Sequence, residues 1–296
     1  MIRYFKKMIK SIPFLGKVAV NIGRRFSGCY LPDLYTVDPK FRDIYIERVN
    51  HAIIQKRLYL SRVINDHFSG TVGYGPFQGL RFTDDSWWGG GDRAGMLLGI
   101  YEKEVLETLT TLSERHEYEY FVDLGAADGY YGIGVVVSGL FEKSYCYEQS
   151  EHGRSLIRQA CVLNDVSDKK VEVRGLATND FYKDLPEDVL RSCVLMVDIE
   201  GAEFSLLDRS VLHAFRKSTI IVELHEMLLE NGDDLLLDLK RRAVEYFSIR
   251  EITVGSRDLS GFKELENYRD DDRWLICSEG RRAVQRWYIM TPKTPS

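Results

Sequence analysis

Two periodicities of apolar and polar positions alternate along the second half of the chain. From residue 120 onward, short apolar runs alternate with segments whose apolar positions recur at helical spacing. The middle runs are almost continuously apolar, as expected of strands buried on both faces. This alternation predicts a doubly wound, Rossmann-like α/β fold with a mostly parallel seven-stranded sheet and an antiparallel last strand. The candidate strands are 120–124, 143–147, 170–173, 193–199, 219–224, 247–254, 274–277 and 287–291.

The first hundred residues carry a different pattern. Residues 39–68 are charged, and their apolar positions are spaced mostly for one face of a helix. The stretch 70–91 is rich in glycine and aromatic residues and ends in three consecutive glycines, which predicts a loop. A helix is expected from about 94 to 112, and another over 233–246.

These patterns predict two parts of unequal size. We expect a basic, helical N-terminal extension over residues 1–69 and one α/β domain over 70–296, with its core at 116–255. The sequence carries no signal of a particular oligomeric state.

The N-terminal segment is basic. Residues 1–32 hold seven lysines and arginines and no acid, and apolar residues are interleaved with them. One interpretation is an amphipathic helix that makes a peripheral membrane contact through residues 1–25. The other is a solvated helix that packs on the body of the protein. A mitochondrial presequence is a third interpretation.

Composition excludes several classes of protein. The net charge of −5 argues against a protein that binds nucleic acid in bulk, so no nucleic-acid partner is expected. No apolar run approaches the roughly 20 residues that a membrane span needs. The five cysteines form neither a CxxC pair nor a Cys/His cluster, which favours a reducing, cytoplasmic location without structural zinc.

A glycine turn after the first strand is the sharpest chemical signal. Asp123 lies near the end of an apolar run, and Gly125, Ala126, Asp128 and Gly129 follow before a helix. Ligands bind at this edge of doubly wound sheets. The spacing is not the GxGxxG pattern of dinucleotide sites. Two carboxylates would repel a pyrophosphate but suit a cationic ligand, which favours S-adenosyl-L-methionine over NAD as cofactor.

The end of the second strand supports a nucleoside ligand. Glu148 follows the run 143–147, about 20 residues after the glycine turn, where a carboxylate can accept both ribose hydroxyls. The adenine is then expected near the loop 175–178, with Ala177 among the residues that bind it.

Ionisable residues also follow the next two strands. Asp198 and Glu200 lie at the end of one apolar run, and Glu223 and His225 lie at the end of the next. Clustered acids with a histidine indicate either a functional site or an ion-pair network. These four residues are also a candidate site for magnesium or calcium. No metal is expected, however, because adjacent residues of a strand point to opposite faces.

Three segments resemble the FkbM-type methyltransferase family. They are the turn DLGAADGYYG, the segment VDIEGAEFSLL and the strand IIVELHE, within a resemblance that covers roughly residues 95–255. The resemblance implies an enzyme that uses S-adenosyl-L-methionine to methylate hydroxyl oxygens of sugars, glycans or related natural products. Asp128 departs from the family, in which many members carry an uncharged residue there.

An alcohol acceptor needs a base that takes its proton. The candidates are Asp198, because its strand end faces the methyl group in such a fold, and His225, because of its ordinary pKa. Trp87, Trp88 and Arg93 are candidates for a lid over a small-molecule or glycan acceptor. Three alternatives stay open: a methyltransferase acting on a soluble small molecule, an NAD-type oxidoreductase, and a nucleotide-binding module without catalysis.

Overall fold

The computed structural model describes residues 34, 38–88, 90–281 and 283–293. Contacts divide the chain into two compact units, Met1–Lys56 and Arg57–Ser296, of which the second holds the sheet. The basic segment 1–25, for which a peripheral membrane contact is one of the interpretations, lies outside the described residues. Within the described residues, no helix has the length and apolar character needed to cross a membrane.

The long helix α3 (Pro39–Phe68) forms where the sequence predicts it. Its last turns carry Leu60 and Ile64, which are buried in the core of the second unit. The contacts therefore place the division after Lys56, whereas the sequence placed it after residue 69. The reason is that apolar residues near the end of α3 find partners in the α/β domain.

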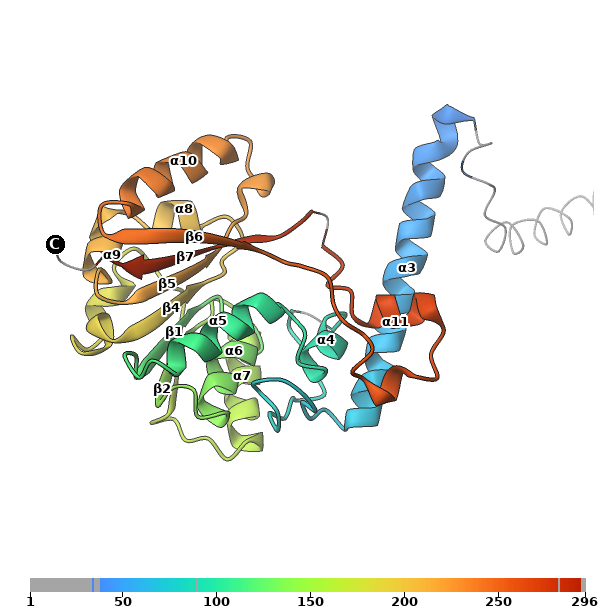
Figure 1. Cartoon of the computed structure of the whole chain (residues 1–296), viewed down its shortest axis with the longest axis horizontal. Helices are drawn as coiled ribbons and strands as arrows, with labels where there is room; N and C mark the ends of the chain where they lie inside the picture. Colours follow the sequence, from blue (N-terminus) through green and yellow to red (C-terminus); the bar gives the residue numbers. More distant parts are fainter. Residues whose placement is uncertain (1–33, 35–37, 89, 282, 294–296) are drawn as a thin grey trace, which may run out of the picture. The chain divides into compact units, whose positions relative to one another are not determined.

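Seven strands form one sheet in the order β3-β2-β1-β4-β5-β7-β6, and Figure 1 shows most of it as a twisted layer between helices. Strand β7 runs antiparallel to both of its neighbours, β5 and β6, and the other neighbouring pairs are parallel. The predicted doubly wound fold with an antiparallel last strand is thereby confirmed. The strands are β1 (Tyr120–Leu124), β2 (Lys143–Tyr147), β3 (Val171–Arg174), β4 (Cys193–Val197), β5 (Thr219–Glu223), β6 (Phe247–Thr253) and β7 (Arg286–Pro292).

Helices cover both faces of this sheet. Side chains alternate along each strand, so Phe121 packs into the core on one face and Val122 into the core on the other. The first core takes residues from α5, α6 and α7, and the second takes residues from α8, α9 and α10. The α-helices of the domain are α4 (Arg93–Leu97), α5 (Lys103–Ser113), α6 (Tyr130–Val137), α7 (Glu151–Leu163), α8 (Glu203–Leu206), α9 (Arg209–Ala214), α10 (Gly232–Ala243) and α11 (Asp270–Ile276).

Short 3-10 helices lie in the connections. They are η1 (Phe181–Asp184), η2 (Val189–Arg191), η3 (Glu226–Leu228) and η4 (Lys263–Leu265).

Two predicted elements differ from the structure. The run 274–277 is not a strand, because it lies mostly in helix α11, which begins with three aspartates that favour a helix N-terminus. The helix predicted over 94–112 is broken into α4 and α5. Gly99 (φ +64°) and Glu102 (φ +45°) take left-handed conformations at the break. The break leaves Glu102 buried beside the ends of the strands.

The turn after β1 lies against the turn after β4. The two strands are parallel neighbours, and the strand order reverses between them, which is where doubly wound sheets bind ligands. Gly125 has φ +90°, and a Cβ atom there would stand 1.8 Å from the carbonyl oxygen of Asp198. Glycine is therefore required at this position both for its conformation and for the close approach of two backbones.

Gly125→Ala should lower the free energy of unfolding by about 3–5 kcal/mol, because the new methyl group overlaps a backbone carbonyl that cannot rotate away. The matched control is Gly139→Ala, at φ +73° with no atom within 4 Å of the new Cβ. Gly139→Ala should lower the free energy of unfolding by only about 1–2 kcal/mol, because alanine is less stable than glycine in the left-handed conformation. Urea unfolding followed by circular dichroism measures both, and equal losses would contradict the close approach.

Candidate active site at the carboxyl edge of the sheet

A cavity of about 470 Å³ opens at the carboxyl ends of β1, β2 and β4. Seven of the nine residues expected at the site line it, whereas Gly129 and His225 do not. Gly129 begins helix α6 in a left-handed conformation. A second hollow, of about 600 Å³, lies in the segment between β6 and β7, away from these strand ends. The seven residues are Asp123, Gly125, Ala126, Asp128, Glu148, Ala177 and Asp198.

Asp123 is a buried carboxyl at the floor of this cavity. Its exposed fraction is 3%, and its Oδ2 atom has no hydrogen-bond partner. Burial, followed by the nearby Asp198 carboxylate, raises the pKa of Asp123 to about 8. The carboxyl of Asp123 is therefore protonated near neutral pH, and it has to lose this proton to pair with a positively charged ligand.

Glu148 is held in one position by its backbone neighbours. Its Oε2 atom accepts the N–H of Ala127 at 2.9 Å, and its Oε1 atom accepts the N–H of Ser150 at 2.7 Å. Helix α7 approaches so closely that a Cβ on Gly153 would lie 2.8 Å from the Glu148 side chain. The carboxylate thus joins the glycine turn to the start of α7 while facing the cavity.

Asp128 connects the glycine turn to the aromatic loop. It accepts hydrogen bonds from the Ser86 hydroxyl at 2.5 Å and from the Trp87 N–H at 2.8 Å, and Arg93 lies 4.0 Å away. Trp87 and Trp88 line the cavity and are about half exposed. Although sequence reasoning assigned Asp128 to the cofactor, the oxygens of this residue hold the loop that carries two tryptophans.

His225 lies behind Asp198 and is surrounded by carboxylates. Its Nε2 atom is 3.7 Å from Asp198, 3.7 Å from Glu200 and 3.8 Å from Glu223. Its Nδ1 atom is 3.3 Å from the buried Glu203. Burial alone would lower the pKa of His225, but Glu203 and Asp198 outweigh it and raise the pKa above its usual value. The structure thus brings together the two residues expected to be catalytic.

Asp198 itself has a raised pKa. Burial is the main cause, and the facing His225 opposes it. Strand β4 ends one residue earlier, at Val197, and β5 ends at Glu223. Asp198, Glu200 and His225 therefore lie in loops, in which Glu200 adopts φ +54°.

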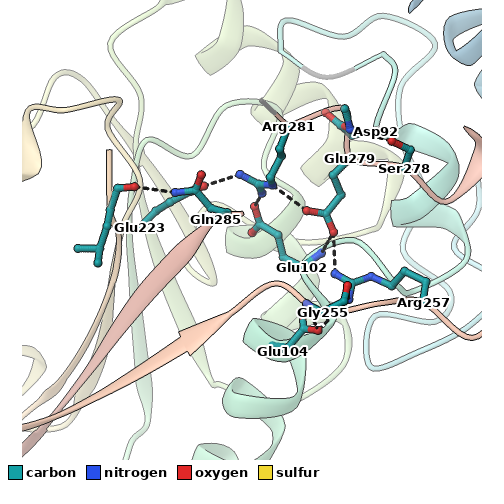
Figure 2. A network of polar contacts seen from close by, with 12 residues as sticks. Asp92, Glu102, Glu104, Glu223, Gly255, Arg257, Ser278, Glu279, Arg281 and Gln285 are labelled. Atoms are coloured by element: carbon teal, nitrogen blue, oxygen red, sulfur yellow. Dashed lines mark hydrogen bonds and ion pairs between the residues drawn. The ribbon is translucent and has the colours of Figure 1, made fainter. Parts of the chain in front are cut away.

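A second set of acids lies beside this cluster, and its three carboxyl groups share one arginine. Arg281, from the segment before β7, contacts Glu102, Glu223 and Glu279, as Figure 2 shows. The Oε1 atom of Glu279 also accepts a hydrogen bond from the Nη2 atom of Arg257 at 2.7 Å. Three chain segments far apart in the sequence thus meet in one network.

Glu102 is the most enclosed acid of this network. It is 1% exposed and accepts the Tyr131 hydroxyl at 2.6 Å. Burial raises the pKa of Glu102 to about 7, and Arg281 opposes that rise. Sequence analysis assigned neither Glu102 nor Arg281 to the site. The only available signal was an arginine pair at 281–282 in a segment outside the recognised motifs.

No protein-family model matches the chain, and no curated protein matches it, so the resemblance to the FkbM-type family stays a prediction. Solved structures with similar folds include a precorrin 8W decarboxylase of Methanobacterium thermoautotrophicum, with 15% identity, 64% of this chain and 89% of that chain covered, and a TM-score of 0.39.

Two further structures are similar at the same level. TYW2 of P. horikoshii, solved with MeSAdo, is 13% identical, with 63% of this chain and 61% of that chain covered and a TM-score of 0.36. The O-methyltransferase of Bacillus cereus, solved with SAH, is 12% identical, with 63% and 80% covered and a TM-score of 0.44. The chain thus spans less than two thirds of the TYW2 length. Because one fold hosts many functions, the chemistry has to be argued from this site.

Arg281→Met should lower the free energy of unfolding by about 3–5 kcal/mol near pH 8, since three buried or partly buried carboxylates lose their shared cation. A carboxyl whose pKa is raised by folding favours the folded state at low pH, and this contribution is lost as the pH rises. The deficit should therefore be small near pH 5 and grow as the pH passes about 7, where Glu102 titrates.

Arg81→Met is the control, since Arg81 pairs with Asp165, whose side chain is 91% exposed. That variant should cost less than about 1 kcal/mol at every pH. Denaturant unfolding at several pH values measures both variants. A deficit in Arg281→Met that stays constant with pH would contradict the role given to Arg281.

Proposed function

We propose that the chain is an S-adenosyl-L-methionine-dependent O-methyltransferase acting on a hydroxyl of a sugar, glycan or related natural product. One observation carries the proposal: five carboxylates and neither lysine nor arginine line the cavity. No lysine or arginine of the walls is available to a pyrophosphate there, whereas a ligand with an ammonium and a sulfonium group finds carboxyl groups with which to pair. The five are Asp123, Asp128, Glu148, Asp198 and Glu200.

The parts of the methyl donor find matching groups around the cavity. Asp123 lies where the methionine ammonium would bind, and the backbone of Gly125 and Ala126 allows close contact with that end. Glu148 is rigidly held and keeps lone pairs for the two ribose hydroxyls. The adenine would lie against Leu176 and Ala177, which line the cavity at the loop after β3.

Methyl transfer is an in-line displacement. The acceptor oxygen forms a bond to the methyl carbon, the carbon–sulfur bond breaks, and the sulfonium becomes a neutral thioether. The hydroxyl proton goes to a base during attack. Asp198 faces the cavity and His225 does not, so we assign the proton to Asp198. The imidazole behind it holds Asp198 in position through their ion pair.

The remaining residues that line the cavity indicate the chemical class of the acceptor. Trp87 and Trp88 are half-exposed at the cavity, and their ring faces suit the apolar face of a sugar ring. A soluble small molecule with the same chemistry is the alternative acceptor, and a module that binds the nucleoside without turnover is the alternative function. The expectation that nucleic acid is not a partner remains a prediction.

Calorimetric titration should show binding of S-adenosyl-L-methionine and none of NAD. Glu148→Gln should weaken the former about 10-fold or more, because an uncharged amide replaces a carboxylate that accepts two hydroxyls. Glu151→Gln is the control, since Glu151 is exposed and does not line the cavity. Binding of NAD, or of neither compound, would exclude the proposed cofactor.

Binding of the donor should also release protons at pH 6.5. The pKa of Asp123 is about 8, so the empty site holds a neutral carboxyl at that pH, and a cationic ligand selects the ionised form. We expect release of close to one proton per bound donor at pH 6.5 and none above pH 9. Calorimetry in buffers of different ionisation enthalpy measures it.

The control for this measurement is Asp123→Asn, which has no proton to lose at this position. The variant should bind the donor more weakly and with the same enthalpy in every buffer. Buffer-independent enthalpy in the unsubstituted protein would disprove the assignment of Asp123 to the cationic end.

A further inference from the structure

More carboxyl groups surround His225 than the arginines of the described residues pair with. Four carboxylates lie within 3.8 Å of its ring nitrogens, from Asp198, Glu200, Glu203 and Glu223. Among the described residues, the arginine that reaches this group is Arg281, and it contacts only Glu223 of the four. Buried carboxylates are stable when they are paired or bind a cation.

The His225 side chain is aimed into this cluster, and its buried Nδ1 atom has no hydrogen-bond partner. The residue is 6% exposed. Its Nε2 atom faces Asp198 and Glu200 at 3.7 Å, beyond hydrogen-bond distance. Its Nδ1 atom faces the fully buried Glu203, which accepts the backbone N–H groups of His225 at 2.9 Å and Gly201 at 2.8 Å. A carboxylate behind one ring nitrogen is the usual arrangement around a histidine that binds metal through the other.

We propose that Asp198, Glu200 and His225 together bind one divalent metal ion. The three side chains each offer one ligand atom, and these atoms lie within 4.8 Å of one another. The Oδ1 atom of Asp198 is buried and has no hydrogen-bond partner. Two carboxylate oxygens and one imidazole nitrogen form a mixed donor set, which suits Mn²⁺ or Zn²⁺ better than Mg²⁺.

The three residues lie in loops, which is why the prediction of no metal from the sequence does not apply to them. In a strand, the side chains of adjacent residues point to opposite faces and could not converge on one ion. The strands end at Val197 and Glu223, so the three ligand residues lie beyond the regular alternation. The left-handed turn at Glu200 and Gly201 re-aims the chain. The side chains of Asp198 and Glu200 therefore converge with His225.

A metal at this place would border the donor cavity, because Asp198 and Glu200 also line it. Three protein ligands leave coordination positions open, and a bound metal lowers the pKa of a hydroxyl that coordinates it. The metal would then lower the pKa of the acceptor hydroxyl, while one oxygen of Asp198 binds the metal and its second oxygen would take the hydroxyl proton. This role rests on the proposed methyltransferase function, whereas metal binding itself does not.

The test is a titration of the chelator-treated full chain with MnCl₂, in which electron paramagnetic resonance counts the free ion. We expect one Mn²⁺ bound per chain and a loss of affinity of about 10-fold or more in Glu200→Gln. Glu200 is suited to substitution because its side chain is 48% exposed. Glu230→Gln, an exposed acid of a nearby loop, should bind like the unsubstituted protein.

Circular dichroism of each variant shows that it remains folded. If the unsubstituted protein binds no Mn²⁺ at millimolar concentration, or if Glu200→Gln binds as tightly as Glu230→Gln, the proposed site is wrong.

A second measurement separates the metal site from the methyltransferase function. Bound Mn²⁺ should broaden the methyl-proton resonance of bound S-adenosyl-L-methionine, because the two sites share a wall. Mn²⁺ binding without donor binding would refute the proposed function and leave the metal site standing. Binding of both without broadening would refute the placement of the metal beside the methyl group.

Discussion

The structure depends on how it accommodates negative charge at one edge of its sheet. Parallel strands bring the residues at the ends of β1, β2, β4 and β5 to the same edge of the sheet. In this chain each of these strand ends carries at least one acidic residue. Glu102 and Glu279 add two more from outside the strands. Carboxylates removed from water repel one another and favour their neutral forms, as the raised pKa values of Asp123 and Glu102 show. Such an edge is stable only with cations beside it.

The protein supplies a cation on one side of this edge and leaves the other side open. Arg281 bridges three acids away from the cavity, and Arg257 supports Glu279 behind them. The carboxylates that line the cavity receive no lysine or arginine from its walls. A cationic ligand is therefore the physical complement of the open side. The proposed methyl donor and the proposed metal ion both meet that requirement, one at Asp123 and the other at His225.

The same acids also hold the scaffold together. Glu148 fixes the glycine turn to helix α7, Asp128 fixes that turn to the loop of Trp87, and Glu203 fixes the loops after β4 and β5 to each other. Each of these three carboxylates accepts one or two backbone N–H groups. Substitution of any of them would change backbone positions as well as charge. Substitutions that preserve size are for this reason the informative ones at this site.

The sequence by itself determined the elements whose signal is local. Apolar runs marked all seven strands, the acid–glycine turn marked the cavity, and Glu148 could be placed by its distance from that turn. Only the tertiary structure decided features that depend on distant partners. The break that buries Glu102, the pairing of Arg281 with acids 58 and 179 positions away, and the convergence of Asp198, Glu200 and His225 are of this kind. The periodicity of apolar positions indicates on which face of an element a residue lies. The partner of a buried charge depends on which distant segment packs against it, and the local sequence does not carry that information.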